Sequence, residues 1–226
     1  MKEHHTESLL RPLNDWERKH APKTIWTEGD ETLLRDGLRV SVVGSRKASP
    51  AGIARANVFC KALVKRGITV VSGLAEGIDS VAHTTAIEEN GKTIAVLGTS
   101  LEECYPKKNG ALLEHIKRSH LAISQFPPGY PMRKDNFPRR NRTMALISDA
   151  TVIIEASEMS GTKHQGWEAI RLGRFVFILE SVATDSKLSW PKEMIEYGAQ
   201  VIRRDTLDLA LDNIPPMTEA GVELAF

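Results

Sequence analysis

Short apolar runs recur through the middle of the chain, and they barely alternate with polar residues. Around Val40–Val43 and Thr93–Leu97, valine, isoleucine, alanine and leucine follow one another almost without interruption. Strands of this kind are typical of a parallel sheet that helices cover on both faces. The pattern predicts seven buried strands, at residues 39–44, 68–73, 92–98, 121–126, 150–156, 174–180 and 199–204.

Segments with helical periodicity lie between these runs. Ser49 and Pro50 open the first segment as an N-cap and a first-turn proline, and Gly67 ends it. Because strands and helices alternate, the pattern predicts an α/β fold, an extended Rossmann-like and doubly wound sheet that is mostly parallel. The other helices are expected at residues 76–89, 111–118, 140–148, 166–172 and 190–197.

The two ends of the chain depart from this rhythm. Residues 1–36, which carry Trp16 and Trp26, are typical of a helix followed by a short strand at 24–27. We expect them to form an N-terminal extension packed on a Rossmann-like domain of residues 37–213. Residues 214–226 contain Pro215-Pro216 and are expected to form a loose tail.

Composition is that of an ordinary globular protein, with 41% hydrophobic and 26% charged residues among 226. There is no run of about 18 apolar residues and no apolar segment after Met1, so neither a membrane span nor a secretory signal is predicted. The two cysteines do not make a disulfide framework. We therefore expect a cytoplasmic protein.

Positive charge is concentrated in one place, the basic decapeptide at residues 133–142. It reads RKDNFPRRNR and contributes +4, although the whole chain has a net charge of only +1. Arginine offers a planar fork of donors that matches phosphate, so this concentration predicts a phosphate-bearing partner. Phe137, in the middle of the decapeptide, is expected in the core, with a stacking platform for a base as the alternative.

Glycine, hydroxyl and arginine residues follow the predicted strands. Gly44-Ser45-Arg46 follows the first strand, Ser72-Gly73 ends the second, and Ser160-Gly161-Thr162 comes after the fifth. Ligands of open α/β sheets bind beyond the carboxyl ends of the strands, where glycines and helix N-termini favour anions. The sequence therefore predicts an anion site at this edge.

The common nucleotide signatures are missing. The chain has neither G-x-x-x-x-G-K-[ST] nor G-x-G-x-x-G after its first predicted strand, which disfavours ATP hydrolysis and dinucleotide redox chemistry. The seven histidines show no metal-ligand spacing. We expect no catalytic residue, cofactor or metal.

Several strings, read in order, resemble the DNA-processing protein A family (DprA, also called Smf). They cover roughly residues 24–180, and the second and fifth are specific. The strings are VVGSR at 42–46, VSGLAEGID with AH at 71–83, TIAVLG at 93–98, YP with Asn109, FPRRNR at 137–142 and SGT at 160–162.

The resemblance implies a short, single-domain member with an extended Rossmann fold that forms a homodimer. It implies a cytoplasmic protein without turnover that binds single-stranded DNA and loads a RecA-type recombinase during natural transformation and recombination. Arg46 and Lys134 would contact DNA phosphates, and Arg139, Arg140 and Arg142 would line or support the same pocket. Backbone and hydroxyl donors would come from Ser45, Ser72, Gly73, Ser160, Gly161 and Thr162.

An enzyme is the alternative, because the wider superfamily resembles phosphoribohydrolases that release a base from a nucleoside monophosphate. In that interpretation Glu168 or Glu155 would stabilise the ribosyl cation and Arg46 would hold the 5′-phosphate. A nucleotide-sensing domain is a third possibility. We favour the DNA-binding interpretation, because the basic decapeptide offers more phosphate contacts than a mononucleotide needs.

Overall fold

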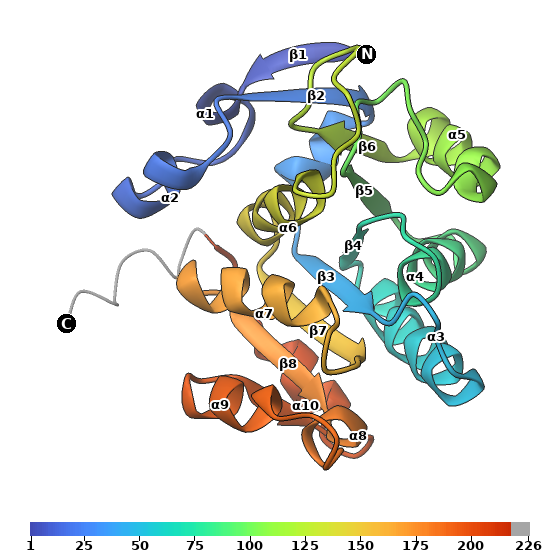
Figure 1. Cartoon of the computed structure of the whole chain (residues 1–226), viewed down its shortest axis with the longest axis vertical. Helices are drawn as coiled ribbons and strands as arrows, with labels where there is room; N and C mark the ends of the chain where they lie inside the picture. Colours follow the sequence, from blue (N-terminus) through green and yellow to red (C-terminus); the bar gives the residue numbers. More distant parts are fainter. Residues whose placement is uncertain (218–226) are drawn as a thin grey trace.

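A computed structural model describes residues 1–217, which form one nine-stranded sheet (Figure 1). All seven predicted strands are present, with boundaries that differ by a few residues, so the predicted fold class is confirmed. The strands are β1 (Lys2–His5), β2 (Thr24–Gly29), β3 (Arg39–Gly44), β4 (Thr69–Ser72), β5 (Thr93–Leu97), β6 (Leu121–Ser124), β7 (Ala150–Glu155), β8 (Phe175–Leu179) and β9 (Gln200–Ile202).

The order of the strands reverses beside β3. In space the order is β1-β2-β6-β5-β4-β3-β7-β8-β9, and the seven strands from β6 to β9 in this order run parallel. The chain builds the sheet outward from β3 to β6 and then returns to place β7 on the other side of β3. The register of β3 against β7 shifts between Val43 and Gly44, at the carboxyl end of β3. This is the topological switch point at which such sheets bind ligands.

Helices cover both faces of the sheet, as a doubly wound fold requires (Figure 1). One face is covered by α3 (Pro50–Lys65), α4 (Ile78–Glu88), α5 (Gly110–Ser119) and α10 (Leu207–Asp212). The other is covered by α6 (Asn136–Leu146), α7 (Thr162–Arg171), α8 (Glu180–Ala183) and α9 (Trp190–Glu196). Within residues 1–217, no helix has both the length and the apolar character needed to cross a membrane.

The N-terminal segment extends the sheet instead of only packing on it. β2 pairs antiparallel with β6, and β1 pairs antiparallel with β2. β1 was not predicted, because Lys2–His5 has no apolar alternation at all. Between the two strands lie α1 (Thr6–Leu9) and α2 (Asp15–His20), and Leu9 of α1 and Leu13 of the segment that joins the two helices belong to the core on the α6 side.

A buried carboxylate fastens α2 to the rest of the domain. The Glu17 side chain is 0% exposed and is paired with Arg11 and with Arg174, the residue before β8. Its Oε2 also accepts from the backbone N–H of Asn14, at 3.0 Å. Burial alone would raise the pKa of Glu17, but the hydrogen bond from Arg11 and the charge of Arg174 outweigh it and lower that pKa.

The beginning of the expected C-terminal tail is packed, not loose. Ile214 and Met217 are 5% and 6% exposed, and the backbone N–H of Met217 donates to Asp149 Oδ1 at 2.7 Å. Ile214 joins the core beneath α3 and α10. The rest of the expected tail, residues 218–226, lies outside the described residues.

Replacing Glu17 tests how the N-terminal segment is held. Because Glu17→Ala leaves the buried Arg174 and the partly buried Arg11 without their carboxylate, we expect the free energy of unfolding to fall by about 3–5 kcal/mol in urea denaturation. Glu7→Ala is the control, since the Glu7–Arg18 pair is solvent-exposed and is expected to contribute less than about 1 kcal/mol. Equal losses from the two variants would contradict this role.

Candidate nucleic-acid interface

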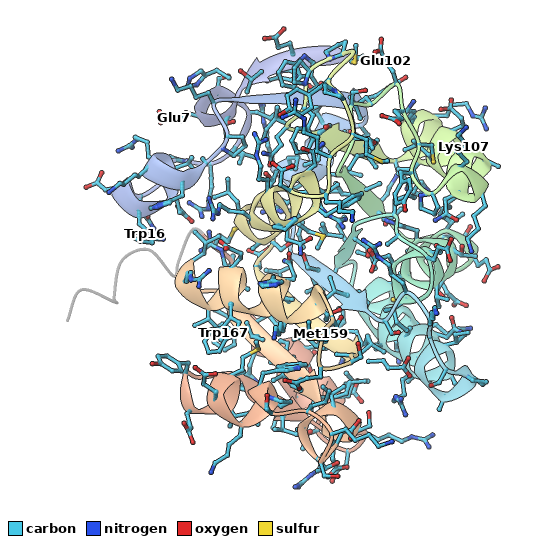
Figure 2. All side chains as sticks on the ribbon, viewed as in Figure 1. Glu7, Trp16, Glu102, Lys107, Met159 and Trp167 are labelled. Atoms are coloured by element: carbon cyan, nitrogen blue, oxygen red, sulfur yellow. The ribbon has the colours of Figure 1, made fainter. Side chains whose placement is uncertain are left out.

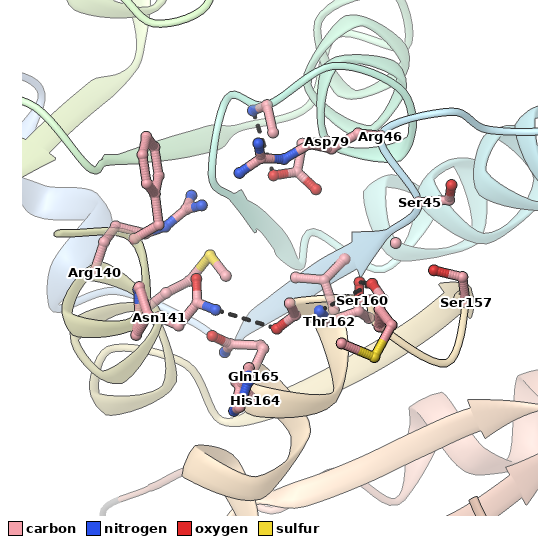
Figure 3. A pocket seen from close by; sticks show the side chains of 18 of the residues that line it. Ser45, Arg46, Asp79, Arg140, Asn141, Ser157, Ser160, Thr162, His164 and Gln165 are labelled. Carbon is pink, nitrogen blue, oxygen red and sulfur yellow. Dashed lines mark hydrogen bonds between the residues drawn. The ribbon is translucent and has the colours of Figure 1, made fainter. Parts of the chain in front are cut away.

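A cavity of about 680 Å³ opens at the switch point, beyond the carboxyl ends of β3 and β7 (Figure 3). Its walls are the loop after β3, the loop from Ser157 to Thr162 after β7, and the N-terminal half of α6. Ser45 and Arg46 line it from the first wall, Ser160 and Thr162 from the second, and Phe137 from the third. The loops after β3 and β7, which were both predicted to bind an anion, therefore line one cavity.

The loop after β3 lies tightly against the start of α4, which begins at Ile78. A Cβ on Gly44 would stand 2.5 Å from Ile78 Cγ1, and a Cβ on Gly77 would stand 2.2 Å from the carbonyl oxygen of Ser45. Gly77 also has a positive φ of 74°, which favours glycine. This packing leaves Arg46 exposed at the rim, with its guanidinium carbon 5.4 Å from the centroid of the Phe137 ring.

The basic decapeptide is mostly helical, which divides its charges. α6 begins at Asn136, four residues before the predicted start, and Pro138 lies in its first turn, where a missing N–H costs no helical hydrogen bond. Successive side chains of a helix point about 100° apart. Lys134 and Arg139 are exposed, whereas Arg140 is only 5% exposed.

Arg140 forms part of the floor of the cavity. Its Nη1 donates to the carbonyl oxygen of Val96 at 3.1 Å, and a Cβ on Gly73 would stand 1.3 Å from the same nitrogen. Gly73 is therefore needed for a close approach to Arg140. Asp79 also lines the cavity: burial raises the pKa of its carboxyl, and the charge of Arg140 opposes that rise.

Two further decapeptide arginines contact protein groups outside the cavity. Arg142 Nε donates to Glu168 Oε2 at 3.1 Å, on α7. Arg139 lies over Phe126, with its guanidinium carbon 5.0 Å from the ring centroid, and it donates to the Tyr130 hydroxyl at 3.3 Å. The structure thus separates Arg46 and Arg140, which line the cavity, from Lys134, Arg139 and Arg142, which do not.

The hydroxyl residues fall into two groups. Ser72 is 0% exposed, and its hydroxyl donates to the carbonyl oxygen of Val42 at 2.7 Å. This bond joins β4 to β3, so the hydroxyl is not available to a ligand. Ser160 Oγ accepts from the N–H of Thr162 at 3.1 Å and donates to Thr162 Oγ1 at 2.7 Å. This bond organises the first turn of α7, which begins at Thr162 instead of the predicted Gly166. Gly161, between the two hydroxyl residues, is exposed.

The glutamates that the enzyme alternative requires lie elsewhere. Glu155 accepts from the N–H of Ser49 at 2.9 Å and lies 3.6 Å from Arg55, so it caps the start of α3. Glu168 is held between Arg142 and Arg171. Neither lines the cavity. Within residues 1–217, no three His, Cys, Asp or Glu side chains gather as a metal site would require.

Some cavity residues were missed by sequence analysis. Asp79 lies in the first turn of α4 and lines the cavity, and its place after Ser72-Gly73 could have indicated this. Asn141 Nδ2 donates to the carbonyl oxygen of Gly161 at 3.4 Å and joins α6 to the start of α7 (Figure 3). Met159 stands 91% exposed on the rim (Figure 2), and its neighbours in sequence gave no signal of that.

Known proteins resemble this chain in sequence and in fold. The chain is 32% identical over 181 residues to the DNA processing protein DprA of Bacillus subtilis, covering 80% of this chain and 61% of the relative. Its fold matches the X-ray structure of DNA processing protein A from Streptococcus pneumoniae with a TM-score of 0.79 and 32% identity, covering 92% of this chain and 73% of the other. The chain therefore spans about three fifths of the length of the first relative and nearly three quarters of the second.

A second solved structure is that of DNA processing protein A from Helicobacter pylori, described as a single-stranded DNA-binding protein. It matches with a TM-score of 0.79 and 25% identity, covering 95% of this chain and 98% of the other. The sequence profile of the family described as DNA recombination-mediator protein A matches residues 7–211. With this match over most of its length, the chain belongs to the DNA recombination-mediator protein A family.

Proposed function

We propose that this protein binds single-stranded DNA, with one nucleotide in the cavity at the switch point and the neighbouring phosphates on its cationic rim. The observation that carries the proposal is the position of Arg46. Its guanidinium is exposed beside the cavity and lies over the Phe137 ring, so one residue offers a charge to a phosphate next to an aromatic surface for a base.

The charges around the cavity support an anionic ligand. Among residues 1–217, neither Arg46 nor Lys134 lies within 4.0 Å of a carboxylate oxygen, so both are available to a ligand. The first turn of α7 faces the cavity with Gly161 and Thr162, and a helix N-terminus favours negative charge. Arg140 adds a positive charge in the floor.

The shape of the site favours a single strand. A cavity of about 680 Å³ has the size of a pocket for a small ligand. A base can enter such a pocket only when it is not paired in a duplex. The Helicobacter pylori relative binds single-stranded DNA, and its agreement with this fold supports the same ligand class here.

The proposed partners follow from family membership. We assign the protein a role in DNA recombination in the cytoplasm, including natural transformation, with a RecA-type recombinase as its partner and a homodimer as its working form. The outer edge of β9, with Val201 37% exposed, and the N-terminal segment, with Trp16 51% exposed, are the surfaces proposed for the contact between subunits.

Salt dependence tests the proposed function directly. Fluorescence anisotropy of labelled oligo-dT at rising NaCl should give a log–log slope of about −2, the value for three phosphate contacts on a single strand. A duplex of the same length should bind more weakly, and thymidine monophosphate should compete poorly. No binding at micromolar protein, or an affinity that salt does not change, would contradict the proposal.

Substitution of individual cations tests which of them contact phosphate. Arg46→Ala and Lys134→Ala should each weaken oligonucleotide binding about three- to tenfold, ~0.7–1.4 kcal/mol, equally for different sequences. Arg142→Ala is the matched control, because that guanidinium is already paired with Glu168. A loss from Arg142→Ala as large as that from Arg46→Ala would show that the assignment is wrong.

Gly73→Ala tests the role of the cavity floor. The added methyl group would displace the Arg140 guanidinium, so the free energy of unfolding should fall by about 1–3 kcal/mol, and oligo-dT affinity should fall with it. Gly161→Ala is the control for stability, since its Cβ would meet no atom within 4 Å. Equal thermal unfolding of Gly73→Ala and wild type would refute this role.

A further inference from the structure

Two aromatic rings in contact, Phe137 and Tyr105, extend from the cavity toward the loop that follows β5. The Phe137 ring, on the cavity wall, lies with its centroid 5.6 Å from that of Tyr105, and the two planes are tilted by 51°. Arg46 also contacts the Phe137 ring, with its guanidinium carbon 5.4 Å from the ring centroid. The three side chains come from the loop after β3, the start of α6 and the loop after β5.

Tyr105 is the more exposed ring of this pair, with 44% of its surface accessible. The loop that carries it is fixed, because Asn109 Nδ2 donates to the carbonyl oxygen of Leu74 at 2.9 Å and to Ser80 Oγ at 3.0 Å. Around Tyr105 itself, Cys104 Sγ donates to the carbonyl oxygen of Pro106 at 3.3 Å. A ring presented from a fixed loop loses little conformational entropy when a ligand stacks on it.

The loop after β5 carries exposed charges of both signs, Glu102 and Glu103 before Tyr105 and Lys107 and Lys108 after it. Lys107, two residues beyond Tyr105 and labelled in Figure 2, is exposed, and among residues 1–217 it lies in no ion pair. Lys107 is therefore a cation beside Tyr105 that a phosphate can reach.

We infer that Tyr105 is a second base-stacking position, so that a DNA strand leaves the cavity over Phe137 and the loop after β5. This inference rests on the proposed DNA binding and adds a path for the strand. The Phe137 and Tyr105 ring centroids lie 5.6 Å apart, so the two rings are close enough to meet neighbouring nucleotides of one strand.

The test compares Tyr105→Ala with Tyr197→Ala, a substitution of the same residue type in a ring that is 65% exposed on the residue after α9. Oligo-dT ligands of increasing length are titrated against both variants and wild type. Tyr105→Ala should weaken binding of the longer oligonucleotides about tenfold, ~1.4 kcal/mol, and should change that of the shortest binding oligonucleotide less than twofold. Tyr105→Trp should retain or improve binding, because any aromatic face supports stacking.

A spectroscopic readout separates stacking from a general loss of affinity. With 2-aminopurine placed at successive positions of oligo-dT, stacking on Tyr105 should quench fluorescence at one position, and Tyr105→Ala should restore it there. If wild type binds DNA and Arg46→Ala weakens binding, but Tyr105→Ala matches Tyr197→Ala at every length, the inference fails and the proposed function stands. If wild type binds no DNA, both fail.

Discussion

The reversal of strand order beside β3 is the constraint on which the site depends. Right-handed crossovers place α3 on one face of the sheet, and the return from β6 to β7 places α6 on the other. The loops that follow β3 and β7 consequently diverge, and a cavity remains between them. The connection that makes the return is the one that carries the basic decapeptide, so topology alone brings its positive charge to the cavity.

Because the decapeptide is mostly helical, its charged side chains point in different directions and lie in different surroundings. Arg140 points inward, and a buried guanidinium costs several kcal/mol unless it is paired, which the Val96 carbonyl and the nearby Asp79 offset. Lys134 stays in solvent, as Arg46 does on the facing loop. The site therefore combines a rigid floor with accessible cations on its rim, an arrangement that suits a ligand with one enclosed nucleotide and several phosphates outside.

The strands could be predicted because burial on both faces gives them continuous apolar runs, whereas the polar edge strand β1 gave no such signal. The start of α6 was predicted four residues too late, although a proline in the first turn, such as Pro138, is compatible with a helix. The contacts of an individual side chain depend on residues that lie far from it in the sequence. Ser72 bonds a carbonyl 30 residues earlier, and Arg142 pairs with a glutamate 26 residues later. Sequence spacing carries no information on such contacts.

The most direct measurement for the central claim is photocross-linking of oligo-dT that carries photoreactive thymine analogues, followed by peptide mapping. The account predicts adducts in the three walls of the cavity, within residues 44–47, 137–141 and 157–162, and their loss as salt rises. Adducts concentrated on α9 and α10 or on the N-terminal strands, with the three walls unlabelled, would contradict it.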